Sequence, residues 1–209
     1  AANGSDGTWG SSGVILFDGG QTDPIRRCNA SGGVVSEQAH PDEKKGESSL
    51  GWPLFLPDGH HYLMVVDGTV SGKPRTTIHV ASIDGPDSKE LVPTDTRAEY
   101  GSGYLVYAEQ NTLVAQKFDP ARLVTIGDPV PLAKGVSSSQ PGYFSASVTG
   151  ALVYMTASSG GNSLLTWMDR QGKELGKESP PGEYRDLALS PDGTRLADGL
   201  SDGRQEDLW

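Results

Sequence analysis

The feature that most constrains the fold of this chain is a glycine that recurs at a nearly constant spacing. Gly13, Gly59, Gly103, Gly150 and Gly193 each end a short polar turn, and an apolar run follows each of them at once. The intervals between them are 46, 44, 47 and 43 residues. A period of this length, with room for four short strands in each repeat, is typical of the blades of a β-propeller.

The second and fourth repeats show the expected strands most clearly. In the second repeat we expect strands at 52–56, 61–66, 77–83 and 89–92, and in the fourth at 143–148, 151–156, 164–169 and 174–177. We name the four strands of a repeat a to d, with strand a innermost. The segment 61–66 is apolar at successive positions, which indicates a strand that lies between two neighbouring blades.

These patterns predict an all-β fold, a β-propeller of four-stranded antiparallel blades with about 4.5–5 blades in this chain. The expected blades are 7–50, 51–95, 96–136, 137–180 and 181–209, the last incomplete. The final repeat stops within its third strand, and the first reaches a strand only at Gly7. A five-bladed ring would therefore need residues 1–7 as the missing outer strand, and otherwise open apolar blade faces invite association.

Composition narrows the classes of function. The 209 residues include 28 Gly and 14 Pro, which favours many turns and little helix. The net charge of −10 argues against a nucleic-acid surface, which needs clustered Lys and Arg. The single cysteine, Cys28, excludes an internal disulfide framework; we interpret it as a small buried hydrophobe, with a reactive thiol as the alternative. No apolar run is long enough to span a membrane, and no signal peptide opens the chain.

Two segments carry a family resemblance. Trp-Pro-Leu-Phe-Leu-Pro-Asp-Gly-His-His-Tyr-Leu at 52–63 and Tyr-Arg-Asp-Leu-Ala-Leu-Ser-Pro-Asp-Gly-Thr-Arg-Leu-Ala at 184–197 resemble TolB-type, WD-repeat-like propeller repeats. The longer pattern over 103–119, 127–132 and 165–175 is similar to the propeller region appended to soil-bacterial (acidobacterial-type) serine/threonine protein kinases.

The resemblance covers essentially the whole chain, although the first, third and fourth repeats lack the Pro-Asp-Gly turn. None of the kinase motifs occurs: there is no Gly-rich loop, no His-Arg-Asp and no Asp-Phe-Gly. The resemblance therefore implies a sensor or docking region of a larger bacterial protein, on the extracytoplasmic (periplasmic) side, and not phosphoryl transfer.

Aromatic residues give the candidate binding surface. Trp52, Tyr143 and Tyr184 all fall where strand a of a blade begins, and Arg185 and Asp186 follow the last of them. Because the beginnings of the inner strands ring one face of a propeller, these side chains are expected at the channel face. Tyr, Trp and Arg are enriched in interaction surfaces. The alternative interpretation is that the aromatic residues pack between blades.

Candidate catalytic groups are sparse. Glu99, Glu183 and Asp186 stand at the starts of inner strands, where a pair of carboxylates would permit glycosidase-like acid–base chemistry, but no supporting partner is visible. If the second and third strands of the second repeat pair across a 67–75 loop, His61 and His79 lie diagonally on one face. Two imidazoles fall short of the three protein ligands of a catalytic zinc site. We predict no catalytic residue, no metal site and no cofactor.

Three hypotheses follow. The first is a non-enzymatic propeller module that binds a protein or a small ligand at the channel face, without nucleic acid and without membrane insertion by this segment. The second is a propeller-fold hydrolase of glycosidase type, or the accessory propeller of a serine peptidase. The third is a structural unit that completes its ring by self-association through open blade edges.

Overall fold

The computed structural model describes residues 6–19, 23–136, 142–155, 165–168, 174–177, 182–201 and 206–208. In these ranges the chain forms antiparallel strands joined by turns, with one short 3₁₀ helix, η1 (Glu43–Lys45). The predicted all-β class is confirmed. No helix within the described ranges is long and apolar enough to cross a bilayer.

Three consecutive repeats each form a four-stranded sheet. The first sheet contains β1 (Gly7–Trp9), β2 (Val14–Phe17), β3 (Ile25–Asn29) and β4 (Ser36–Ala39). The second contains β5 (Glu47–Phe55), β6 (His61–Val70), β7 (Lys73–Ser82) and β8 (Ser88–Pro93). The third contains β9 (Glu99–Gly101), β10 (Tyr104–Glu109), β11 (Thr112–Asp119) and β12 (Val124–Lys134). In each sheet the strands pair in sequence order, as expected of a propeller blade.

The remaining two repeats are less regular. The fourth repeat gives two separate hairpins, β13 (Phe144–Ala146) with β14 (Leu152–Tyr154) and β15 (Thr166–Met168) with β16 (Glu174–Lys177). The last sheet has three strands, β17 (Glu183–Leu189), β18 (Leu196–Ser201) and β19 (Glu206–Leu208). In the described residues no pairing joins β14 to β15, so the fourth repeat is not one continuous four-stranded sheet there.

The central hairpin of the second sheet is longer than its sequence suggests. The expected 67–75 loop is wrong, because β6 and β7 stay paired up to Val70 and Lys73. The turn is reduced to Ser71 and Gly72, and both have positive φ (52° and 76°), as a tight type I′ hairpin requires. The polar residues 67–69 resemble a loop in the sequence but continue the strand pairing.

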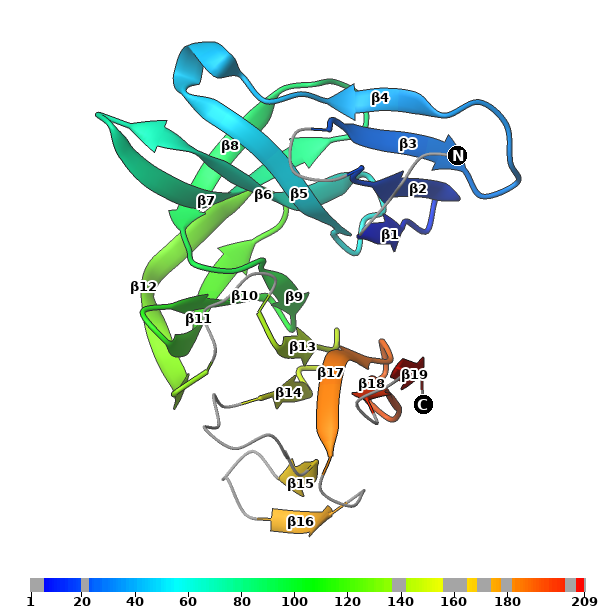
Figure 1. The fold of residues 1–209 in the computed structure, drawn as a ribbon, viewed down its shortest axis with the longest axis vertical. Coiled ribbons are helices and arrows are strands. Elements are labelled where there is room, and N and C mark those ends of the chain that lie inside the picture. Colours follow the sequence, from blue (N-terminus) through cyan, green and yellow to red (C-terminus); the bar gives the residue numbers. More distant parts are fainter. Residues whose placement is uncertain are drawn as a thin grey trace.

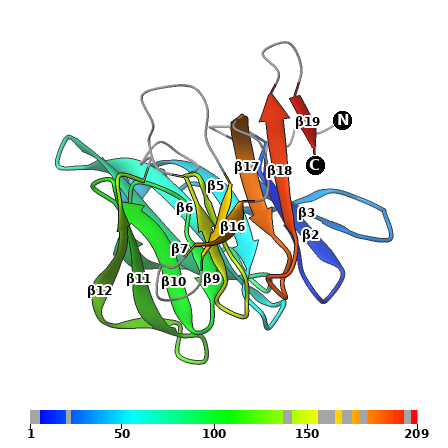
Figure 2. The ribbon, with the colours of Figure 1, turned by 90° about the horizontal axis from the view of Figure 1, so that it is seen from below.

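Each sheet packs its face against the next sheet. One core cluster joins the first and second sheets, a second joins the second and third, and a third joins the third sheet to β13. The first includes Leu16, Ile25, Tyr62 and Met64, all of which are buried. In Figure 1 the repeats follow one another along an arc, and in Figure 2 strands β12, β11, β10 and β9 stand side by side from the outside toward the middle.

Hydrogen bonds between the a–b turns reinforce this arrangement. The Ser12 hydroxyl donates to the Gly59 carbonyl (3.1 Å), and the Ser102 hydroxyl donates to the Val148 carbonyl (3.2 Å). The Thr149 hydroxyl donates to the Asp192 carbonyl (3.1 Å). Each bond connects one repeat to the next, so the turns that contain the periodic glycines also hold neighbouring blades together.

Candidate functional site

The inner strands place equivalent residues around the middle of the arc. By strand register, Trp9 lies opposite Ile15, Phe55 opposite Tyr62, and Tyr100 opposite Leu105. Ala146 and Leu189 hold the same position in the fourth repeat and the last sheet, opposite Leu152 and Leu196. One residue per repeat, next to the a–b turn, therefore defines a ring of equivalent inner positions.

Four of these positions border a cavity of about 210 Å³. The wall consists of residues from the ends of β5, β9, β13 and β17 and from the turns that follow them: Leu54, Phe55, Pro57, Glu99, Tyr100, Ser145, Ala146, Ser147, Val148, Leu189 and Pro191. In Figure 1 these four strands lie around the middle of the arc. A concave site with apolar walls and few polar groups is the usual form of a small-ligand pocket.

Glu99 is the one carboxylate among the described residues that line this cavity. Its side chain is only 13% exposed, and the Arg97 Nε donates to its Oε1 at 3.2 Å. Burial raises the pKa of Glu99, and this effect outweighs the opposing influence of the Arg97 guanidinium. Glu99 is therefore a desolvated carboxyl group with a hydrogen bond at Oε1 and, among the described residues, no partner at Oε2.

Arg97 is itself held by the next repeat. Its Nη2 donates to the Phe144 carbonyl at 3.0 Å, and its guanidinium carbon lies 5.8 Å from the centre of the Phe144 ring. A cation over an aromatic face is attracted by the ring quadrupole. These contacts fix Arg97, and through it Glu99, at the junction of the third sheet and the fourth repeat.

Side-chain hydroxyls of one inner strand accept hydrogen bonds from backbone N–H groups of another inner strand. The Thr8 Oγ1 accepts from the Phe55 N–H (3.1 Å), and the Ser145 Oγ accepts from the Leu189 N–H (3.2 Å). No described group accepts the Ser145 hydroxyl proton, so this proton remains available to an acceptor in the cavity. The site thus combines mostly apolar walls with the desolvated carboxyl of Glu99 and the hydroxyls of Ser145, Ser147 and Tyr100.

The aromatic residues predicted to bind lie elsewhere. Trp52 is in the middle of β5 with φ 48°, where its N–H donates to the Asp18 Oδ2 (3.1 Å), and its ring packs against the core between the second and third sheets. Its indole N–H is buried without a described partner. Tyr184 is 4% exposed, and Tyr143 precedes β13 and is partly buried. None of these lines the cavity.

Arg185 and Asp186 have described backbones in β17, with Arg185 opposite Gly199 and a register shift before Ala188. Their side chains, and that of Glu183, lie outside the described part of the structure. The binding role of the five predicted residues therefore stays a prediction.

The two histidines do not share a face, so the predicted diagonal arrangement is wrong. His61 lies opposite Ser82 and His79 lies opposite Met64, which puts the two on opposite faces of the sheet. His79 is buried, contacts Ser88 Oγ (3.0 Å) and Thr77 Oγ1 (3.1 Å), and has a pKa lowered by burial. Among the described residues no group of three or more His, Cys, Asp or Glu side chains is arranged to hold a metal ion.

Of the cavity residues, the sequence pattern predicted only Glu99, because the predicted binding positions are the beginnings of the inner strands. Phe55, Ala146 and Leu189 stand four residues before their turn glycine, and Tyr100 stands three before. This offset was visible in the sequence. What was not visible is that the cavity lies beside the a–b turns, at the other end of the same strands.

Comparisons with known proteins agree on the fold. The chain is similar to the Kuenenia stuttgartiensis hydrazine synthase (14% identity, TM-score 0.60), covering 95% of this chain and 56% of that one. It is also similar to prolyl oligopeptidase B from Galerina marginata (14%, TM-score 0.54), covering 99% of this chain and 36% of that one. A third similar structure, an exo-1,5-α-L-arabinanase from a bovine ruminal metagenomic library, is 9% identical (TM-score 0.51), with coverage of 100% and 93%.

These neighbours are propeller-type folds, and at such identities they show the fold alone. The chain spans about half of the first neighbour and about a third of the second. No family model matches the chain, and no curated protein matches it. The fold and the similarities together define an all-β protein of the propeller type.

Proposed function

We propose that this protein is a non-enzymatic propeller module that binds a small ligand, or one side chain of a protein partner, in the central cavity. The observation that carries the proposal is the cavity itself, which the ends of four successive inner strands border with mostly apolar walls and, among the described lining residues, the single carboxyl of Glu99. A volume of about 210 Å³ is smaller than the roughly 300–1,000 Å³ of most ligand pockets, so it suits only a compact molecule or a single inserted side chain.

The chemistry of the lining selects the occupant. Phe55, Tyr100 and Leu189 offer apolar contact, and the Oε2 of Glu99 accepts a hydrogen bond from an N–H or O–H donor. A cationic donor would lower the pKa of Glu99, opposing the effect of burial, and so be favoured beside this carboxyl. The preferred occupant therefore pairs a compact apolar body with an amine.

Benzylamine tests this proposal as a simple probe of that shape. Saturation-transfer NMR with the wild-type chain should detect binding, with benzyl alcohol binding more weakly because it carries no charge. Glu99→Gln should weaken benzylamine binding about tenfold, as expected for loss of one charged contact of about 1.4 kcal/mol. Ala146→Phe, which fills the cavity, should abolish binding of both probes.

Glu109→Gln is the matched control, because Glu109 is on the same sheet but does not line the cavity. It should leave benzylamine affinity unchanged. Binding that survives both Glu99→Gln and Ala146→Phe would place the probe outside the cavity and refute the proposal.

We also propose what kind of protein this module belongs to. The resemblance of 52–63 and 184–197 to TolB-type repeats supports a sensor or scaffold region of a larger bacterial protein on the extracytoplasmic side. The likeness of the chain to part of two longer proteins is consistent with a module. Identifying the segments encoded on either side of these residues tests this directly: a kinase domain supports it, and a catalytic hydrolase domain favours the accessory-propeller alternative.

A second candidate function, a glycosidase-like hydrolase, is favoured by one observation, the raised pKa of Glu99. A carboxyl whose pKa is raised by burial is suited to act as a general acid. The arabinanase among the structural neighbours names a substrate to try. Hydrolysis of an arabinan oligosaccharide that Glu99→Gln abolishes, and that Glu109→Gln does not, would replace the binding proposal.

A further inference from the structure

The inner-ring residues direct their backbone N–H groups away from their own sheets. In an antiparallel hairpin, opposite residues alternate between hydrogen-bonded and non-hydrogen-bonded pairs. The Ser147 N–H donates to the Ala151 carbonyl (2.9 Å), so these two residues form a hydrogen-bonded pair. Ala146, the next residue of the strand, is therefore at a non-hydrogen-bonded position opposite β14. Because β13 is the inner strand of its hairpin, the Ala146 N–H is directed inward, where the cavity lies.

The N–H group of Tyr100 has the same geometry. Ser102 and Gly103 form a two-residue turn with φ of 50° and 82°. Such a turn is closed by a hydrogen-bonded pair, which here is Gly101 with Tyr104. Tyr100 precedes this pair and is at a non-hydrogen-bonded position opposite β10. Since β9 is the innermost strand of the third sheet, the Tyr100 N–H is also directed toward the cavity.

Side-chain hydroxyls accept the inward N–H at two other ring positions. The Thr8 Oγ1 accepts from the Phe55 N–H (3.1 Å), and the Ser145 Oγ accepts from the Leu189 N–H (3.2 Å). Thr8 and Ser145 hold the same place, since each directly precedes the ring residue of its own repeat. An inward N–H is thus satisfied where the preceding repeat carries a hydroxyl at this place.

The second and third repeats carry no hydroxyl at this place, where they have Leu54 and Glu99. Leu54 has no acceptor for the Tyr100 N–H, and the Glu99 Oε1 is bound by Arg97. Among the described residues, neither the Tyr100 N–H nor the Ala146 N–H has an acceptor. Because both residues line the cavity, two backbone donors remain for its occupant.

Ser145 adds a third donor to the same part of the cavity. Ser145 is only 6% exposed, and no described group accepts its hydroxyl proton. The three donors come from β9 and β13, which contact each other. A carboxylate, with two oxygens and about four acceptor sites, matches such a group of donors. The Glu99 Oε2, which has no described partner, offers the opposite chemistry and accepts from an ammonium group.

The charges around the cavity favour an occupant that carries both a carboxylate and an ammonium group. Glu99 and Arg97 form an ion pair (3.2 Å), so the pair is neutral in total. A lone amine would add one uncompensated positive charge to a desolvated region, and a lone carboxylate one negative charge; either is unfavourable. A zwitterion adds no net charge.

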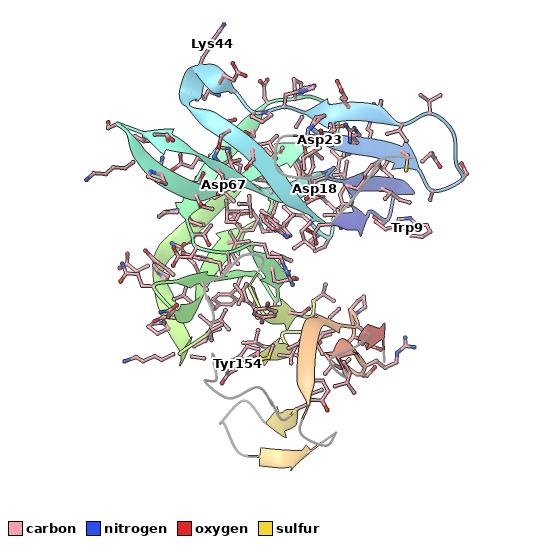
Figure 3. The ribbon with its side chains drawn as sticks, in the orientation of Figure 1. Trp9, Asp18, Asp23, Lys44, Asp67 and Tyr154 are labelled. Atoms are coloured by element: carbon pink, nitrogen blue, oxygen red, sulfur yellow. The ribbon has the colours of Figure 1, made fainter. Side chains whose placement is uncertain are left out.

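The apolar part of the lining sets the size of the occupant. Phe55 and Leu189 offer apolar contact in a cavity of about 210 Å³, which has room for a compact side chain only. Trp9, the ring residue of the first sheet, is not part of this lining. It is 69% exposed and projects outward from β1 in Figure 3. The contacts to an occupant therefore come from the second to the last repeats.

We propose that the cavity binds a free α-amino acid with a compact apolar side chain. This inference rests on the proposed function and extends it, because it adds a carboxylate to the amine. The ligand carboxylate accepts from the N–H groups of Tyr100 and Ala146 and from the hydroxyl of Ser145. The ligand ammonium donates to the Glu99 Oε2, and the ligand side chain lies against the apolar wall.

Isothermal titration calorimetry of the 209-residue chain with L-leucine tests the proposal. Isopentylamine is L-leucine without its carboxylate, and isocaproate is L-leucine without its amine. Each should bind at least about tenfold more weakly than L-leucine, because it loses charged hydrogen bonds and carries a net charge. L-leucinamide, which represents the N-terminal residue of a peptide, should also bind more weakly, since a neutral amide replaces the carboxylate.

Two variants separate the two halves of the ligand. Ser145→Ala should weaken binding of L-leucine and isocaproate about tenfold and leave isopentylamine unchanged. Glu99→Gln should weaken L-leucine and isopentylamine by a similar factor, without weakening isocaproate. Thr8→Val is the matched control, because it removes the same kind of hydroxyl acceptor as Ser145→Ala but Thr8 does not line the cavity. It should leave the affinities of all three ligands unchanged.

L-leucine that binds no tighter than isopentylamine overturns the amino-acid proposal and leaves the proposed function intact, because the amine still binds. Equal affinities for L-leucine and L-leucinamide also overturn it and indicate a peptide N-terminus. If Ser145→Ala weakens all ligands equally, the hydroxyl has only a structural role and the assignment of the carboxylate fails. If none of these ligands binds, nor benzylamine, both the inference and the proposed function fail.

Discussion

The second and third sheets and the fourth repeat start from the same sequence signal and reach different degrees of order. In the second sheet, five consecutive residues of β6, Tyr62–Val66, are buried because sheets cover both faces. The corresponding strand of the fourth repeat, β14, has three residues, and its Tyr154 is 40% exposed. A turn glycine with an apolar run gives a hairpin in both regions, but only in the second sheet are both faces of the second strand buried against neighbouring sheets.

The largest expected loss of stability comes from truncating a leucine in the second sheet, compared with a leucine in the fourth repeat. Leu63→Ala should destabilise the chain by about 3 kcal/mol, since Leu63 is fully buried between the second and third sheets. Leu152→Ala should cost about 1 kcal/mol, because Leu152 is only partly buried in β14. Urea denaturation measures both. Equal losses would mean that the fourth repeat is as well packed as the second sheet.

The next largest loss of stability is expected at Gly101, where the third sheet contacts the fourth repeat. A Cβ on Gly101 would come within 2.5 Å of the Ser147 carbonyl oxygen, so Gly101→Ala should force the third sheet away from β13 at a cost of about 1–3 kcal/mol. Gly85→Ala is the control, since its Cβ meets nothing within 4 Å. Thermal denaturation should show a lower midpoint for Gly101→Ala alone.

Smaller losses of stability are expected when the hydrogen bonds between neighbouring a–b turns are removed. Ser12→Ala removes the link from the first to the second repeat, and Thr149→Ala removes the link from the fourth to the last. Each should cost about 0.5–1.5 kcal/mol. Hydrogen exchange should show loss of protection confined to the two hairpins that each bond joins. Protection lost throughout the chain in either variant would contradict this local role.

The pH dependence of Glu99 gives the smallest effect. Because its pKa is raised in the folded state, the native chain binds more protons than the unfolded chain in the range above the ordinary value of 4.5. The stability of the wild type relative to Glu99→Gln should therefore decrease as the pH rises through that range. Urea denaturation at several pH values checks the sign. A relative stability that increases with pH would show that the Arg97 contact outweighs burial.

Much of the fold was predictable because its signal is local. The propeller class follows from the glycine period, and the expected strand 89–92 lies within β8. The strand at 61–66 was predicted as apolar on both faces, and five of its residues are buried in β6. The length of the β6–β7 hairpin was missed, because the continuation of a strand through Asp67 and Thr69 depends on pairing with β7 and not on hydrophobicity.

The candidate site was less predictable. The sequence marks Glu99 as a carboxylate at the start of an inner strand, but its burial and its Arg97 contact depend on Phe144, 45 residues further along the chain. The side chains proposed from the sequence, such as Trp52 and Tyr184, are aromatic residues whose type suits either a binding face or a core. Residue type cannot separate these roles, because the burial that decides between them is a property of the neighbouring sheet.

The sequence by itself determined the repeat, the all-β class and the a–b turns, since positive-φ glycines and apolar runs act over a few residues. Only the tertiary structure decided which end of the inner strands holds the cavity and which carboxyl is desolvated. Those features arise where residues more than 40 positions apart come together. Their energies are set by burial and by partners that no local pattern specifies.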